Sequence, residues 1–171
     1  MRRVALFLLL TGLLASGQGW SNSYDEPLNF KCPPGQSISS ITSTHNNFYE
    51  DRQWDFGCKD KFIQRTGCVL SHYVNNFDQD FTFECPQHYV ITGMNSFHNN
   101  FFEDRQWQFY YCKSKCEVSS NCQWTPYVNW LDETFHWNVP DNHVLVGAGS
   151  YHHNVHEDRR WRYKYCEQKS C

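Results

Sequence analysis

The chain has 171 residues, a formal net charge of −3 and an aromatic content of 18%. This aromatic content is incompatible with a disordered tail, and the sequence has no Gly-X-Y period of the kind that marks a fibrous chain. The near-neutral charge excludes a protein built mainly to coat nucleic acid, because that task needs a strongly basic face. The 9 cysteines are an odd number, so a monomer in which every cysteine is paired is impossible.

The first segment has the three parts of a secretory signal peptide. Arg2 and Arg3 precede an apolar run over residues 4–14, and small residues follow that run. The run is shorter than the ~20 apolar residues that a membrane span requires, and no later run approaches that length. We therefore predict that residues 1–17 are removed and that residues 18–171 form a secreted domain in a compartment that permits disulfides.

Internal repetition organises the rest of the chain. A 12-residue segment that begins at His45 recurs at His98 and again at His152. Equivalent positions upstream are Asn22, Asn75 and Asn129, then Asp25, Asp78 and Asp132, then Phe30, Phe83 and Trp137. The repeated units are residues 20–71, 72–125 and 126–171. No low-complexity linker separates the units, so we predict a single compact domain with approximate threefold symmetry.

The local patterns in each unit are those of β-strands. Residues 52–56 and 81–85 alternate apolar and polar side chains with period two. An apolar run such as residues 144–146 precedes a polar Asn-Asn segment, which suits a turn. Three or four strands per unit predict an all-β fold, closed as a β-trefoil-like barrel or as a β-prism-like arrangement, since both hide sheet edges.

The repeated Asp-Arg-x-Trp motif places its Arg and Trp on one face of a strand, because side chains alternate along a strand. Arg52 therefore cannot pair with Asp51, and its guanidinium is placed to stack on Trp54 and to reach a carboxylate of a neighbouring unit. The first interpretation of the motif is thus a structural lattice that holds the units together. The lattice residues are Asp51, Arg52, Trp54, Asp104, Arg105, Trp107, Asp158, Arg159 and Trp161.

The second interpretation is a shallow sugar-binding pocket in each unit. Amide, carboxylate and imidazole groups beside the motif suit sugar hydroxyls, and the Trp rings would stack on a pyranose if they are exposed. Weak sites repeated three times gain avidity on a multivalent surface. The candidate glycan contacts are His45, Asn47, Glu50, His98, Asn100, Glu103, His152, Asn154 and Glu157.

Unit three has two features of its own. Arg160, Arg162 and Lys164 share one strand face, which is either a charged edge that prevents aggregation or a contact for a sulfated glycan or an anionic lipid. His153 and His156 add imidazoles near the third motif. The other two units have one His each at the motif, so a metal shared by all three units is not predicted, and no cofactor is expected.

Glu-Asp-Arg-Gln-Trp-x-Phe followed by Cys, together with Cys-Pro near the start of a unit, resembles the dermatopontin family. The similarity covers the whole mature chain, and the triple Asp-Arg-x-Trp is a specific signal. The resemblance implies an extracellular, non-enzymatic adhesion protein, associated in the family with collagen fibril assembly, proteoglycan and integrin binding, or cell agglutination.

The repeat also constrains the disulfides. Unit three has Val139 in place of the early cysteine of the other units, so Cys166 needs a partner outside that pattern. The predicted bonds join Cys32 with Cys58, Cys85 with Cys112, Cys122 with Cys166, and Cys116 with Cys171. Cys68 is then left over, either as an intermolecular disulfide in a homodimer or as a buried or capped thiol.

No Gly-x-Ser-x-Gly, His-Glu-x-x-His or P-loop signature occurs, and a site repeated three times is typical of a binding protein, so an enzyme is not expected. We predict a secreted extracellular-matrix adhesion protein that binds proteoglycans or glycosaminoglycans and collagen-associated matrix proteins and supports collagen fibril organisation. The alternative is a lectin-like agglutinin that binds cell-surface glycans and mediates cell aggregation or innate defence. Neither role involves nucleic acid.

Overall fold

In the described part of the chain, the regular secondary structure consists of β-strands. The computed structural model describes residues 19–61, 63–64, 66–169 and 171, so the predicted signal peptide lies outside the described residues. The strands are β1 (Leu28–Lys31), β2 (Gln36–Asn46), β3 (Asp51–Asp60), β4 (Val69–Leu70), β5 (Phe81–Glu84), β6 (Tyr89–Asn99), β7 (Asp104–Lys113), β8 (Val118–Trp124), β9 (Phe135–Asn138), β10 (His143–His153) and β11 (Asp158–Gln168). The all-β prediction is confirmed. Within the described part of the chain, no helix has the length and apolar character to cross a membrane.

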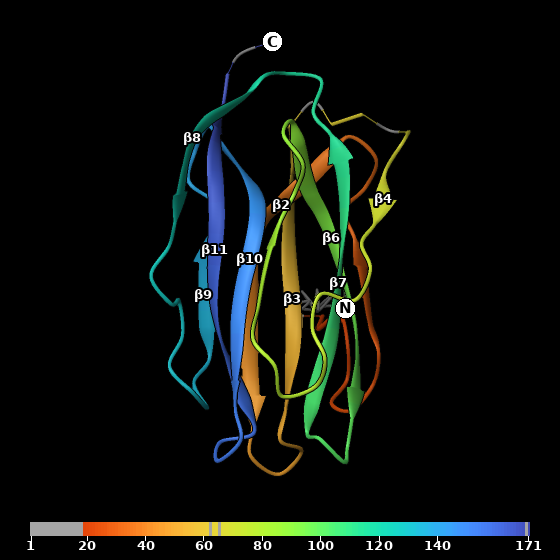
Figure 1. The fold of residues 1–171 in the computed structure, drawn as a ribbon. Coiled ribbons are helices and arrows are strands. Elements are labelled where there is room, and N and C mark those ends of the chain that lie inside the picture. Colours follow the sequence, from red (N-terminus) through yellow and green to blue (C-terminus); the bar gives the residue numbers. More distant parts are fainter. Residues whose placement is uncertain (1–18, 62, 65, 170) are drawn as a thin grey trace, which may run out of the picture.

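The strands form three sheets, and each sheet combines strands from two units (Figure 1). The orders are β1-β6-β7-β4, β5-β10-β11-β8 and β3-β2-β9. The first strand of each unit thus joins the long hairpin of another unit: β1 pairs with β6, β5 with β10 and β9 with β2. This exchange runs in a closed cycle, so no unit can complete its sheet alone.

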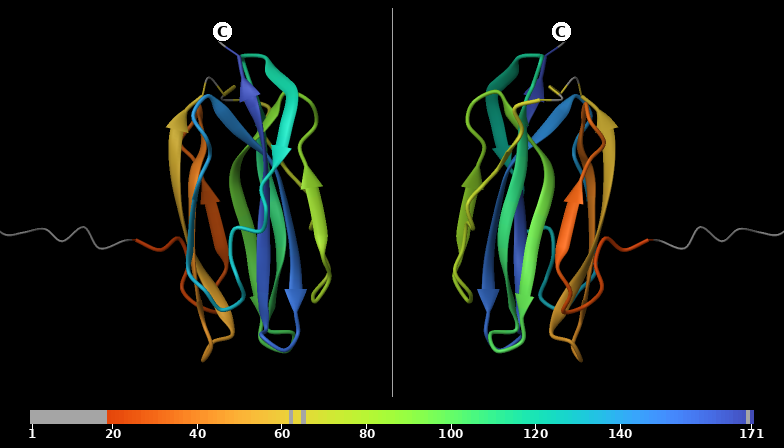
Figure 2. Two further views of the ribbon diagram at one scale, coloured as in Figure 1. Left: turned by 90° about the vertical axis from the view of Figure 1, so that its left-hand side faces the viewer. Right: turned by 90° about the vertical axis from the view of Figure 1, so that its right-hand side faces the viewer.

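A long hairpin is the centre of each unit, formed by β2–β3, β6–β7 and β10–β11. Its register pairs the motif His with the motif Arg in every unit, as in His98 with Arg105. Each hairpin carries a bulge at an equivalent place, for example between Ile91 and Gly93. The predicted Asn-Asn turn is present, since the first Asn ends the strand and the second begins the turn. All three hairpin tips lie at one end of the molecule (Figures 1 and 2).

Aromatic side chains fill the core between the sheets. Trp54, Trp107 and Trp161 pack edge to face, with ring centroids 4.7–5.1 Å apart, which is a favourable geometry for aromatic pairs. A second aromatic pair in each unit stacks beside them. These pairs are Phe30 with Phe56, Phe83 with Phe109, and Trp137 with Tyr163. The aromatic excess of the sequence is therefore largely one core arrangement formed three times.

The disulfides differ from the prediction at one place. The bonds join Cys32 with Cys58, Cys68 with Cys112, Cys116 with Cys171, and Cys122 with Cys166. The predicted bond between Cys85 and Cys112 is wrong, and so is the surplus thiol at Cys68 with the homodimer built on it. Cys85 is the free cysteine of the described residues and is half-buried.

Strand neighbours explain this pairing. β4 lies beside β7, with Val69 opposite Tyr111, which brings Cys68 next to Cys112. In the same way β8 lies beside β11 and places Cys122 opposite Cys166. Both bonds close loops with a sequence separation of 44 residues. Because Cys112 is bonded to Cys68, Cys85 is left without the bond that its equivalent, Cys32, makes to Cys58.

Candidate functional site

Each motif strand is fixed by the loop that precedes the first strand of its unit. In unit one, Asn22 Nδ2 donates to the Arg52 carbonyl at 3.0 Å, and the Trp54 backbone N–H donates to Asn22 Oδ1 at 2.9 Å. Asn75 and Asn129 make the same two bonds in the other units. The buried amide thus fixes the loop against the strand by satisfying backbone groups that would otherwise be orphaned.

Six buried side chains form a closed ring of ion pairs, which we call the Arg–Asp ring. Its members are Asp51, Arg52, Asp104, Arg105, Asp158 and Arg159, each 3–4% exposed. Every Arg donates through Nε and Nη2 to both oxygens of an Asp in another unit, at 2.6–2.8 Å. The pairs are Arg52 with Asp158, Arg105 with Asp51, and Arg159 with Asp104. As the alternation along the strand predicts, no Arg pairs with the Asp beside it.

The ring is built to keep its charges ionised. Burial alone raises the pKa of Asp158, but the hydrogen bonds and charge of Arg52 outweigh burial and hold that pKa below its ordinary value. Bidentate pairing of this kind combines strength with fixed geometry. The Arg–Asp ring therefore fastens the three units together, and its polar atoms face one another and not a ligand.

The Trp side chains of the motif are not available for a sugar. Trp54, Trp107 and Trp161 are 0–1% exposed, so the pyranose-stacking interpretation is wrong. A cavity lies at the centre of the motif residues, but its volume of ≈ 20 Å³ holds about one water molecule and no sugar ring. The three Trp rings are instead packed in the hydrophobic core.

The candidate glycan contacts are divided by burial. The imidazoles of His45, His98 and His152 are 0–1% exposed and turn inward, so they cannot meet a glycan at the surface. Asn47, Asn100 and Asn154 are exposed on the hairpin turns, and each holds Nδ1 of its own unit's His through Oδ1 at 3.1–3.3 Å. Glu50, Glu103 and Glu157 are about one-third exposed.

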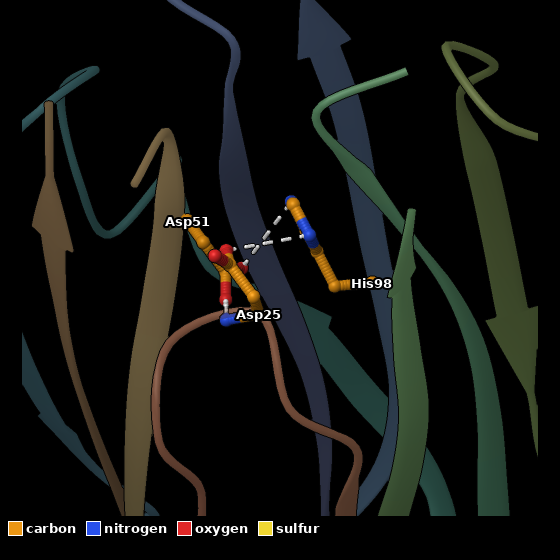
Figure 3. A group of neighbouring side chains, drawn as sticks. All are labelled: Asp25, Asp51 and His98. Atoms are coloured by element: carbon orange, nitrogen blue, oxygen red, sulfur yellow. Dashed lines mark hydrogen bonds and ion pairs between the residues drawn. The ribbon is translucent and has the colours of Figure 1, made fainter. Parts of the chain in front are cut away.

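Each inward-facing His meets two Asp side chains of another unit. Around His98, Asp25 Oδ1 lies 3.5 Å from Nδ1, and Asp51 Oδ1 lies 4.0 Å from Nε2 (Figure 3). Two further clusters repeat this arrangement around His45 and His152. The three clusters are His98 with Asp25 and Asp51, His45 with Asp132 and Asp158, and His152 with Asp78 and Asp104. In each cluster, one ligating atom of every residue lies within 4.8 Å of the other two.

The outer face of β11 carries a strip of cations and aromatic rings, which we call the cationic strip. Its members are Arg160, Arg162, Lys164, Trp124, Tyr127 and Trp130. The guanidinium of Arg160 lies 4.1 Å from the Trp130 ring centroid, and that of Arg162 lies 4.8 Å from the Trp124 centroid. Trp130 is 66% exposed, so the strip is open to solvent. Lys164 differs from the two arginines, because Glu84 neutralises it at 2.6 Å.

The strip is not a sheet edge. β11 pairs with β10 on one side. On the other side β8 pairs with β11 from Lys164 onward, and the loop after β8 covers the stretch with Arg160 and Arg162, where the Val128 N–H donates to the Trp161 carbonyl at 2.8 Å. The interpretation of these cations as a guard against edge aggregation therefore does not apply. The equivalent positions on β7 are Gln106, Gln108 and Tyr110. The strip is therefore a property of unit three alone.

Sequence reasoning missed two groups of residues. The loop residues Asp25, Asp78 and Asp132 were visible as equivalent positions of the repeat, but nothing local placed them against a His of another unit. The aromatic members of the strip were also missed, although Trp124, Tyr127 and Trp130 recur at intervals of three residues.

The fold and these sites define a disulfide-linked, all-β repeat protein whose units are joined by buried ion pairs and which carries one strip of cationic and aromatic side chains on its surface. A family model described as Dermatopontin matches residues 22–171. The chain belongs to the dermatopontin family.

Relatives of known name are similar over most of the chain. The hemagglutinin/amebocyte aggregation factor of Limulus polyphemus is 40% identical over 100% of both chains. Millepora cytotoxin-1 of Millepora dichotoma is 41% identical over 85% of this chain and 65% of its own length. Dermatopontin of Biomphalaria glabrata is 35% identical over 83% of this chain and 95% of its own. No solved structure matches this chain.

Proposed function

We propose that the chain is a secreted, non-enzymatic adhesion protein of the extracellular matrix that binds sulfated glycosaminoglycan chains of proteoglycans through the cationic strip. Family membership supports the broader part of this proposal, an adhesion or aggregation role without chemistry of its own. Removal of residues 1–17 as a signal peptide and a role in collagen fibril organisation belong to the same proposal.

The observation that carries the proposal is the alternation of cations and rings on β11. A guanidinium offers a planar fork that matches sulfate oxygens bidentately. The flanking rings of Trp130 and Trp124 hold Arg160 and Arg162 in place and exclude water from one side, which strengthens an ionic contact. The chain as a whole is negatively charged, so this strip is a local and directed attraction for a polyanion.

A heparin column tests the proposal with charge-matched variants. We expect the Arg160→Gln/Arg162→Gln variant to elute at lower salt and to bind at least tenfold more weakly, because a hydrogen bond to a charged group contributes about 1.5–3 kcal/mol. Lys113→Gln/Lys115→Gln removes the same charge from two exposed positions elsewhere and should retain most of the affinity. Equal retention of both double variants would show that net charge, and not the strip, governs binding.

The hairpin tips favour a second candidate function, an agglutinin that aggregates cells. Phe48, Phe101 and Val155 occupy equivalent tip positions and are 85–86% exposed. The three hairpin tips lie at one end of the molecule (Figure 1), so these apolar side chains and the cationic strip provide two different surfaces for bridging. A relative named for hemagglutination and amebocyte aggregation supports this candidate.

Red-cell agglutination separates the two candidates. Agglutination that a simple saccharide inhibits, and that Phe48→Ser/Phe101→Ser abolishes, supports the agglutinin. Accelerated collagen fibril formation without inhibition by free sugar supports the matrix role, and the strip variant should then lose it.

A further inference from the structure

The three His–Asp–Asp clusters carry atoms that the protein itself leaves without partners. Among the residues that the structure describes, none forms a hydrogen bond with the buried Nε2 of His45, His98 or His152, or with Oδ1 of Asp25, Asp78 or Asp132. Burying a polar atom without a partner is costly. The same pair of orphaned atoms occurs in all three clusters, so a common occupant is the simplest way to satisfy them.

The imidazole of each cluster is prepared as a ligand. In the tautomer that carries the proton on Nδ1 of His98, this N–H faces Asn100 Oδ1 at 3.3 Å and Asp25 Oδ1 at 3.5 Å, and the lone pair of Nε2 is left free. Metal-bound His residues commonly donate their other N–H to such an oxygen. Asp51 is oriented in the same manner, because Oδ2 accepts from the Asp25 backbone N–H at 2.8 Å and Arg105 holds both oxygens.

The spacing of the groups suits a small cation. Two ligands of a tetrahedral Zn²⁺, each about 2.1 Å from the ion, lie about 3.4 Å apart. Glu103 Oε2 lies 3.6 Å from Nε2 of His98, and Asp51 Oδ1 lies 4.0 Å from it. Figure 3 shows the Asp25 and Asp51 carboxylates on the same side of the imidazole. These distances are too long for good hydrogen bonds between the groups.

The net charge of the groups around each His also favours the binding of a cation. Around His98, the three carboxylate groups of Asp25, Asp51 and Glu103 contribute −3 and the guanidinium of Arg105 contributes +1, so these four groups sum to −2. A single divalent ion would balance this charge.

We propose that each His–Asp–Asp cluster is a binding site for a divalent transition-metal ion, with Zn²⁺ as the best match. One imidazole with carboxylate oxygens suits Zn²⁺, whereas Ca²⁺ prefers six to eight oxygen ligands. Each ion would join the His of one unit to two Asp of another, and so would link the same pairs of units as the Arg–Asp ring. This inference is independent of the glycosaminoglycan proposal, since the clusters share no residue with the cationic strip.

Stoichiometry tests the proposal on untagged full-length protein freed of metal by a chelator. Titration with Zn²⁺, followed by calorimetry and by elemental analysis of the dialysed complex, should give three equivalents per chain, one for each cluster. His98→Gln should leave two sites, and so should Asp25→Asn, which keeps the backbone N–H bond to Asp51. His72→Gln changes an exposed imidazole outside the clusters and should keep all three sites.

The His45 cluster offers a variant that leaves every ligand in place. His156 Nδ1 lies 2.6 Å from Asp132 Oδ2 and orients that carboxylate. His156→Gln should therefore weaken one of the three sites by about 10-fold to 100-fold, the usual effect of losing such a supporting group. The melting temperature of each folded variant should rise with Zn²⁺ in proportion to the sites that remain.

Two results would overturn the proposal. The first is a Zn²⁺ stoichiometry that His98→Gln and Asp25→Asn leave unchanged. The second is absence of Zn²⁺ binding by the metal-free protein, and NMR signals of doubly protonated imidazoles for His45, His98 and His152 would then identify a proton as the balancing cation.

Discussion

Arg105 gives the most direct measure of how much the Arg–Asp ring stabilises the protein. Arg105→Met keeps much of the side-chain volume but leaves the Asp51 carboxylate, 3% exposed, with only the Asp25 backbone N–H as donor. Breaking one partner of a buried ion pair costs about 3–5 kcal/mol, because the remaining charge is uncompensated. At this chain length each kcal/mol lowers the melting temperature by about 2–4 °C, so a fall of roughly 6–20 °C is expected.

Urea unfolding without reductant, followed by Trp fluorescence, measures this loss while the disulfides stay intact. A chelator in the buffer separates the effect of the ring from any bound metal. Arg160→Met is the matched control, since Arg160 is half-buried and has no carboxylate partner, and its loss removes a cation–π contact and a hydrogen bond from Nε to the Asn129 carbonyl, which together should cost only about 1–2 kcal/mol. Replacing both ring partners in Arg105→Met/Asp51→Leu should recover much of the stability. A loss below 1 kcal/mol for Arg105→Met alone would refute the assignment of the ring as the fastening between units.

Other features of the structure give three further expectations. Arg52 lowers the pKa of Asp158, so that carboxylate stabilises the fold fully above its unfolded value of about 3.9 and loses this contribution as pH falls through the lower folded value. Unfolding free energy should then fall steeply below about pH 4, and a flat acid limb contradicts this. Alkylation without reductant, followed by mass analysis, should modify Cys85 and not Cys68, and the chain should remain a monomer; slow modification is expected because burial raises the pKa of the Cys85 thiol. Gly93→Ala should destabilise the β1–β6 pairing by about 1–3 kcal/mol in thermal unfolding, because its Cβ would lie 2.3 Å from a backbone oxygen of β1. Gly19→Ala is the control and should not destabilise the protein, since a Cβ at Gly19 would lie in open space.

The repeat made much of the fold predictable. Period-two alternation in residues 52–56 and 81–85 identified strands, and alternation also required that Arg52 reach beyond Asp51 to another unit. The exchange of first strands among the sheets was not predictable, because it depends on which hairpin accepts the strand and no local signal carries that choice. It is this exchange that turns a repeat in sequence into a closed molecule.

The cysteine error has the same origin. The repeat made Cys85 and Cys112 equivalent to Cys32 and Cys58, so a bond between them was expected. Cys112 is equivalent both to Cys58, which bonds to Cys32, and to Cys166, which bonds to Cys122, so symmetry permits either Cys85 or Cys68 as its partner. The short strand β4 lies beside β7 and brings Cys68 to Cys112. Cys68 and Cys112 are 44 residues apart in the sequence, as are Cys122 and Cys166. This equal spacing was the sequence signal that could have identified the bond. Counting equivalent positions alone cannot rank two partners that symmetry permits equally.

Some candidate sites follow the threefold symmetry of the fold, and the cationic strip does not. Closing three units in a ring requires the same contacts at every junction, which accounts for three copies of the Arg–Asp pair, the buried Asn and the Trp core. These repeated residues serve the packing of the units, and the burial of Trp107 and His98 prevents both from contacting a ligand at the surface. Arg160 makes the bond to the carbonyl of Asn129 that Gln106 makes to that of Asn75, but this bond does not require a charge, and Gln108 stands in unit two where unit three has Arg162. Charges that the fold does not need, held on a strand that the fold does need, are free to serve a ligand.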